Sequence, residues 1–199
     1  MNSEILIEKL NFPRAYRKTR LELAHWVIDH PKTFPELLSI CFDEESKISH
    51  KAAWILEFVC TEKIEMLLPH LDLFFNQIPK ARKDQSVRPF SKICLMLSKL
   101  IYKKKDILVI NSLSQQHKEA MISCGFDWLI TEQKVACQAY AMDALYLLGT
   151  EIEWVHPELG IILKQNIPHR SAAYKARGRI TLEKIEKYQN SNKIKRSSQ

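Results

Sequence analysis

Basic side chains at helical spacing are the groups in this sequence with the clearest binding chemistry. Lys and Arg bind carboxylate and phosphate groups, and their densest cluster is Lys175, Arg177 and Arg179. We expect this cluster to lie on a helix, and similar residues occur on three preceding helices. Together these helices are expected to line the concave side of a repeat array. The candidate binding residues are Lys51, Arg88, Lys92, Lys134, Gln138, Lys175, Arg177 and Arg179.

Two of these cations have a competing structural interpretation. Lys51 and Arg88 follow acidic turns, and pairing with Asp43 and Asp84 would form a ladder of ion pairs along the array. For these two residues the ladder is favoured over ligand binding. For Arg177 and Arg179 surface binding is favoured, because Glu183 is their only acidic neighbour at helical spacing.

No sequence motif indicates a metal site or a nucleophilic catalytic residue. No two of the seven histidines are three or four residues apart, and the chain has no Gly-x-Ser-x-Gly motif and no glycine-rich phosphate loop. We therefore expect no metal and no cofactor. The cysteines lie in apolar helical stretches, which predicts packing roles and a reducing, cytoplasmic compartment. They are Cys41, Cys60, Cys94, Cys124 and Cys137.

One enzymatic alternative is base excision. An anion and indole rings would together stabilise a cationic base. The residues that could supply these parts are Trp54, Trp128, Tyr140 and Trp154, with Asp127 or Asp143.

Composition and charge indicate a helical globular chain. Hydrophobic residues make up 46% of the 199 residues, which is enough for a core, and the four glycines are few for a β-rich fold. The net charge is +7, and Lys193, Lys195 and Arg196 place +3 of it in a final stretch without acids. No apolar run is long enough for a membrane span, and the first residues predict no signal peptide.

A recurring pattern sets the architecture. Small-residue helices are expected to start near Ile48, Val87, Val135 and Ala172, so their starts lie 39, 48 and 37 residues apart, the size class of a two-helix repeat. Each follows a bulkier apolar helix. This predicts an all-α, right-handed α-solenoid of four to five helix pairs over residues 1–188, with 1–31 as capping helices and 189–199 as a disordered basic tail.

Local signals refine this prediction. Residues 62–77 are expected to form one helix that Pro69 bends or restarts, and residues 104–114 a loop insertion that explains the long 48-residue interval. Ser114 and Ser171 are expected to cap the helices that follow them. Gly149 is expected to end a helix.

The segment Leu37–Leu56 resembles a HEAT repeat: an apolar helix, an acidic turn, then a helix with Ala52 and a closing Leu56. Leu67–Leu71 resembles a HEAT first helix, and Val87-Arg88 matches the opening of a second helix. The resemblance covers roughly residues 32–186 and implies that the all-α solenoid is HEAT/armadillo-like. Ala136 and Ala173 replace the basic residue of the second-helix opening in the last two units.

Residues 51–60 and 172–179 are similar to short bacterial HEAT-like proteins that are often labelled adenylosuccinate lyase. That lyase needs a Ser-Ser-x-Met-Pro-x-Lys-x-Asn loop, and this chain has no such string, so lyase activity is not expected. The resemblance implies a binding scaffold rather than an enzyme. We expect a protein partner on the concave face and no membrane partner. Nucleic acid is the alternative, because some HEAT-like proteins similar in size to this chain excise alkylated bases from DNA with a carboxylate and aromatic side chains.

Overall fold

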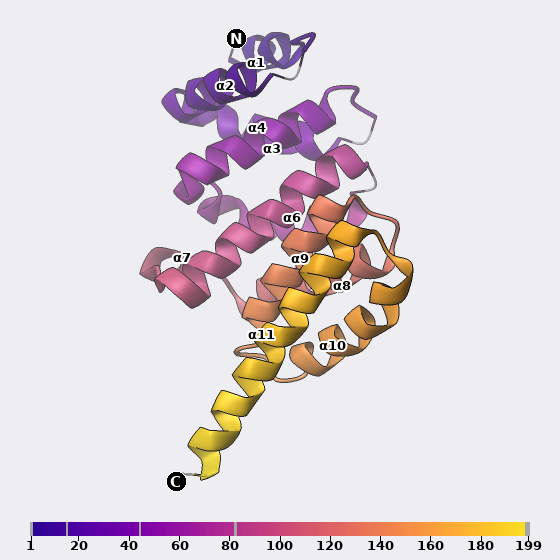
Figure 1. The fold of residues 1–199 in the computed structure, drawn as a ribbon. Coiled ribbons are helices and arrows are strands. Elements are labelled where there is room, and N and C mark those ends of the chain that lie inside the picture. Colours follow the sequence, from indigo (N-terminus) through magenta and orange to yellow (C-terminus); the bar gives the residue numbers. More distant parts are fainter. Residues whose placement is uncertain (1, 15, 44, 82, 198–199) are drawn as a thin grey trace.

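The computed structural model describes residues 2–14, 16–43, 45–81, 83–197, and in them the chain is built from helices. Ten of the α-helices form five consecutive pairs, and α7 is an insertion between the third and fourth pairs (Figure 1). The pairs are α1 (Asn2–Leu10) with α2 (Arg17–Asp29), α3 (Phe34–Phe42) with α4 (Ser49–Glu62), α5 (Leu71–Gln77) with α6 (Asp84–Lys99), α8 (Gln115–Ile130) with α9 (Val135–Leu148), and α10 (Val155–Asn166) with α11 (Ala172–Ser197).

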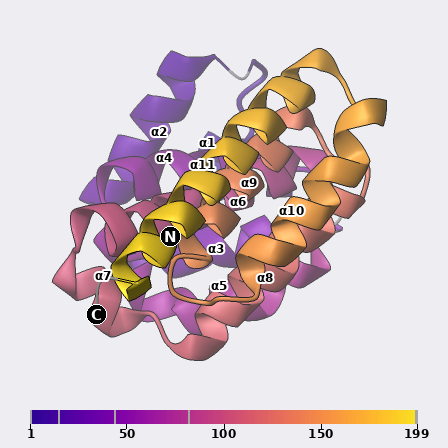
Figure 2. The same cartoon turned by 60° about the horizontal axis from the view of Figure 1, so that its bottom comes forward.

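The second helices of the pairs form one continuous layer. Helix α2 packs on α4, α4 on α6, α6 on α9 and α9 on α11. The first helices form the other layer, in which α5 contacts α8 and α8 contacts α10. Figures 1 and 2 show this succession of helices from the N-terminal pair to α11. The expected all-α solenoid of helix pairs is confirmed.

Small side chains let neighbouring second helices approach each other closely. Ala52, Ser91 and Ala141 are fully or almost fully buried. The Ser91 hydroxyl donates a hydrogen bond of 2.9 Å to the carbonyl oxygen of Cys137, which ties α6 to α9. Bulky side chains such as Phe34 and Phe74 fill the space between the layers, so each pair buries its apolar surface only by stacking.

Several expected helix ends agree with the structure. Ser114 caps α8: its hydroxyl accepts from the His117 amide, and His117 Nδ1 accepts from the Ser114 amide. Ser171 accepts from the Tyr174 amide at the start of α11. Gly149 follows α9, as expected, but in an αR rather than a left-handed conformation.

The expected helix over residues 62–77 is broken into three parts. Short 3₁₀ turns at Ile64–Met66 and Leu68–His70 precede α5. Pro69 lies at the start of the second turn, where a missing N–H is tolerated. The first helix of the third pair is therefore short.

The expected loop insertion at residues 104–114 contains a helix. After α6, a π-helical turn (Leu100–Lys104) ends at Lys105, which has a left-handed φ of 55°. Asp106 then caps α7 (Ile107–Ser112) by accepting from the amides of Leu108 and Val109. The insertion lies between the third and fourth pairs and accounts for the long repeat interval.

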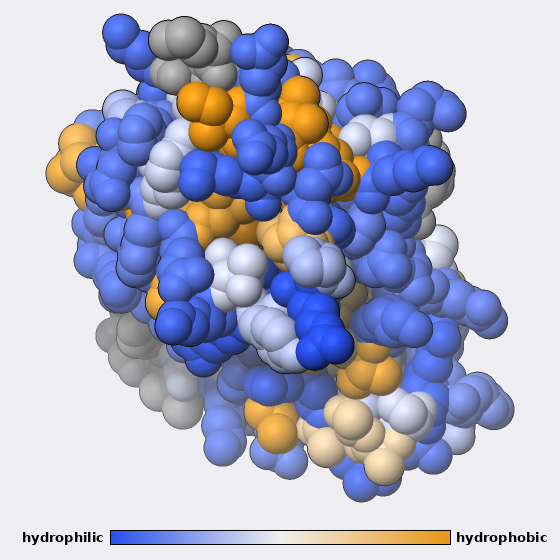
Figure 3. All heavy atoms as spheres, turned by 90° about the horizontal axis from the view of Figure 1, so that it is seen from above, coloured by the Kyte–Doolittle hydropathy of each residue, from blue (hydrophilic) through white to orange (hydrophobic). Residues whose placement is uncertain are grey.

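The two ends of the array differ. From the N-terminal end, hydrophilic side chains cover most of the surface and hydrophobic ones form separate patches (Figure 3). At the other end α11 continues past the body to Ser197, into the stretch expected to be a tail (Figure 1). No helix in the described residues is both long and apolar enough to cross a membrane.

The turn after α9 yields a packing prediction. A Cβ added to Gly149 would lie 2.6 Å from Nε2 of His156, a buried ring that bonds to the Tyr146 carbonyl and stacks on the Tyr146 ring. We expect Gly149→Ala to lower the free energy of unfolding by about 1–3 kcal/mol, measured by urea denaturation.

Gly160→Ala is the matched control. A Cβ at Gly160 meets nothing within 4 Å, and this glycine lies inside α10. The control should therefore be neutral or stabilising by up to about 1 kcal/mol. Equal stability of the two variants would contradict the packing described for His156.

Candidate binding surface

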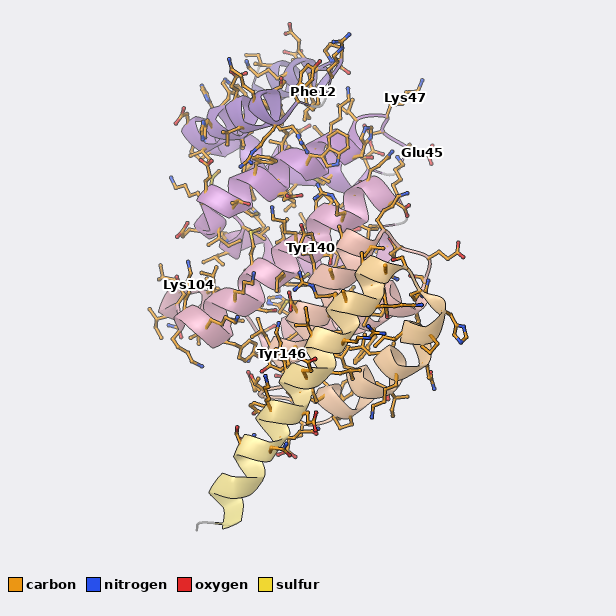
Figure 4. The ribbon with its side chains drawn as sticks, viewed as in Figure 1. Phe12, Glu45, Lys47, Lys104, Tyr140 and Tyr146 are labelled. Atoms are coloured by element: carbon orange, nitrogen blue, oxygen red, sulfur yellow. The ribbon has the colours of Figure 1, made fainter. Side chains whose placement is uncertain are left out.

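The side of the second-helix layer that points away from the first helices is here called the second-helix face. Most of its charged and aromatic side chains are partly exposed, and Figure 4 labels Tyr140 and Tyr146 among α6, α9 and α11. The residues that define it are Arg20, Trp54, Glu57, Phe58, Arg88, Lys92, Leu95, Tyr140, Asp143, Ala144, Tyr146, Leu147, Arg177 and Lys184.

The first charged group on this face joins α4 to α6. The Glu57 side chain is 4% exposed, and its two oxygens accept from Arg88 Nη2 at 3.0 Å and Lys92 Nζ at 2.7 Å. The two cations are about one-third exposed. One carboxylate thus holds two cations, and the group keeps a charge of +1 toward solvent.

The second charged group repeats this arrangement between α9 and α11. Asp143 accepts from Arg177 Nη1 at 3.3 Å and from Lys184 Nζ at 2.9 Å. The Lys184 ammonium also lies 5.6 Å from the ring centroid of Tyr146. This group also has a surplus of one positive charge.

A third cation lies on aromatic rings near the N-terminal end of the face. The Arg20 guanidinium of α2 is 5.6 Å from the Trp54 ring and 5.4 Å from the Phe58 ring, both on α4. Its Nε is buried and has no hydrogen-bond partner among the described residues. Stacking on the two rings orients the guanidinium, and no carboxylate among the described residues pairs with its charge.

Apolar side chains lie between the two charged groups. Leu95 of α6 and Ala144 and Leu147 of α9 form a cluster separate from the main core. Tyr140 and Tyr146 pack against it, and both are partly exposed. The second-helix face is therefore a mosaic in which an aromatic-covered apolar area separates two cationic groups.

A third carboxylate holds the turn after α9 in a similar way. Glu151 accepts from Lys118 Nζ at 2.7 Å and from the Tyr102 hydroxyl at 2.6 Å. Burial opposes ionisation of Glu151, but the hydrogen bonds from Lys118 and Tyr102 outweigh it and lower its pKa. Burial and the bond to Glu151 raise the pKa of Tyr102.

The structure assigns other partners to the cations expected to form a ladder with the acidic turns. Arg88 pairs with Glu57 and not with Asp84, because the neighbouring second helix presents a carboxylate closer to its guanidinium. Lys51 donates to the carbonyl oxygen of Phe12 at 2.8 Å and lies over the Phe12 ring, rather than pairing with Asp43. The ladder with Asp43 and Asp84 was wrong.

The prediction that Gln138 is a surface contact was also wrong. It is buried, and its Nε2 donates to the carbonyl oxygens of Trp128 and Thr131 at the end of α8, each at 3.3 Å. It joins α8 to α9. Lys134 is exposed at the N-cap of α9.

The dense cluster on α11 is divided between two sides of the helix. Residues two apart on a helix point in nearly opposite directions. Arg177 faces Asp143, so Lys175 and Arg179 point away from the second-helix face. Of the eight sequence candidates, the structure brings Arg88, Lys92 and Arg177 onto this face.

Sequence reasoning missed Glu57, Arg20 and Lys184. The spacing of Arg88 and Lys92, four apart on one helix side, was a signal for a shared carboxylate. Which carboxylate it was depended on the neighbouring helix, because Glu57 is 35 residues from Lys92 in the chain.

The aromatic residues considered for base excision do not converge. Trp54, Tyr140 and Asp143 belong to second helices, whereas Trp128 is buried in α8. Trp154 precedes α10 and stacks on Phe126. The carboxylate of Asp143 is already held by two cations.

The thiols are packing groups. All five cysteines are free and buried, and burial raises their pKa values, to about 12 for Cys124 and Cys137. In the part of the chain that the structure describes, no three His, Cys, Asp or Glu side chains come together as a metal site would require.

Comparison with known proteins identifies the family. A family model described as a HEAT repeat domain matches residues 8–185. The chain therefore belongs to the HEAT repeat domain family, whose members generally serve as protein-interaction scaffolds. No curated protein and no solved structure matches the chain.

The buried carboxylate of the first charged group yields a stability prediction. Glu57→Gln would leave Arg88 and Lys92 side by side without a counter-charge, so we expect the free energy of unfolding to fall by about 1–3 kcal/mol. Chemical denaturation at neutral pH measures this.

Glu65→Gln, at an exposed carboxylate, is the control and should change stability by less than about 0.5 kcal/mol. A neutral Glu57→Gln would show that the shared carboxylate does not hold α4 to α6.

Proposed function

We propose that this chain is a non-enzymatic scaffold that binds another protein on the second-helix face, and that this face is the concave side of the array. The observation that carries the proposal is the mosaic of cations, carboxylates and aromatic-covered apolar side chains. Protein interfaces combine an apolar, aromatic centre with a polar rim. Tyr140 and Tyr146 supply the centre here, and the paired cations supply the rim.

Nucleic acid is the less well supported alternative. A phosphate backbone favours an uninterrupted positive surface, because each phosphate carries a charge. On the second-helix face Glu57 and Asp143 lie among the cations and neutralise half of each group. We therefore expect no retention of duplex DNA in a gel shift at about 150 mM salt. Retention at that salt, lost in Lys92→Glu, would favour the alternative.

Site-specific photo-crosslinking tests the proposal directly. A benzoyl-phenylalanine at position 140 should form a covalent adduct with a protein in cells, because this position lies at the apolar centre of the second-helix face. The same group at position 161, an exposed isoleucine on α10, is the control. Adducts at position 161 but not at 140 would refute the second-helix face as the binding surface.

A further inference from the structure

We infer that the second-helix face binds an extended protein segment in which acidic residues flank apolar or aromatic ones. This inference rests on the proposed function and names the chemistry of the partner. It follows from the order of the groups on the face, which alternates charge and apolar surface along the array.

Uncompensated positive charge marks three places on the face. The groups centred on Glu57 and Asp143 each hold two cations against one carboxylate. The stacked Arg20 guanidinium is the third, with no carboxylate partner among the described residues. A partner with acidic side chains at matching positions would neutralise each surplus. It would do so next to protein surface, where charge pairs are stronger than in bulk water.

The apolar surface between the Glu57 and Asp143 groups indicates which residues of the partner lie between its acidic side chains. Leu95, Ala144 and Leu147 are about 5% exposed each, and Tyr140 and Tyr146 pack beside them. Both tyrosines are partly exposed, and Leu, Tyr or Phe side chains of a partner would pack on the uncovered parts of their rings. A polar partner segment beside Tyr140 and Tyr146 would leave this apolar area exposed to water.

The spacing of the second helices sets the length of the segment. Packed helices are about 8–10 Å apart, and two such steps lead from α6, with Arg88 and Lys92, to α11, with Arg177 and Lys184. An extended chain advances about 3.3 Å per residue. Acidic residues about five or six positions apart would therefore reach both groups. The Arg20 guanidinium lies against α4, one helix step from α6, so a third acidic residue about three positions further on would reach it.

Peptide binding by fluorescence anisotropy tests the inference. The probe is a labelled peptide of about 15 residues with glutamates about six positions apart and Leu and Tyr between them. The control peptide has the same composition in scrambled order. We expect the patterned peptide to bind the full chain at least about tenfold more tightly than the scrambled one, and binding to weaken with salt.

Charge reversal on opposite sides of one helix locates the site. Lys184→Glu should weaken binding of the patterned peptide by about tenfold, because Lys184 belongs to the second charged group. Arg179→Glu, on the far side of α11, should leave it within about twofold. Both residues are partly or fully exposed, and circular dichroism checks that both variants fold. Equal loss in the two variants would overturn the inference.

Other outcomes also decide between occupants. Equal binding of the two peptides, or displacement of the patterned peptide by a duplex oligonucleotide at lower concentration, would overturn the acidic-segment inference. Sedimentation showing a dimer that Lys184→Glu dissociates would assign the face to a second copy instead. If position 140 crosslinks a protein while the patterned peptide does not bind, the proposed function stands and this inference fails.

Discussion

Close contact between neighbouring second helices is the constraint on which the rest of the structure depends. Ala52, Ser91 and Ala141 are small enough for helix backbones to approach, and the Ser91 hydroxyl reaches the Cys137 carbonyl across the α6–α9 contact. A larger side chain at these positions would separate the helices. Because the contacts repeat, five pairs share one continuous core rather than five small ones.

The same closeness creates the charged groups of the second-helix face. Glu57 reaches Arg88 and Lys92, and Asp143 reaches Arg177, because the helices that carry them are packed side by side. Each carboxylate serves two cations and is partly covered by them. The pairs hold successive repeats together and, at the same time, leave positive charge exposed to a partner. The residues that hold the repeats together are thus the ones that we propose to bind a partner.

The insertion shows how the array accommodates an irregular repeat. The π-helical turn and the left-handed Lys105 redirect the chain out of α6, and buried Val109 anchors α7. Pairing then resumes with α8, whose start is fixed by the reciprocal Ser114–His117 hydrogen bonds. His117 also donates from Nε2 to Asp72 at 2.7 Å, which links the fourth pair back to the third.

The sequence by itself determined the helical class, the repeat interval and the cap at Ser114, because these depend on residues close together in the chain. It also indicated that Arg88, Lys92 and Arg177 are surface cations. Only the tertiary structure decided which groups these cations pair with and that Gln138 is buried. It also decided that Arg177 lies on a different side of α11 from Lys175 and Arg179. Those outcomes depend on which helix packs beside which, over separations of 31–35 residues for the Glu57 pairs, and local patterns carry no record of that distance.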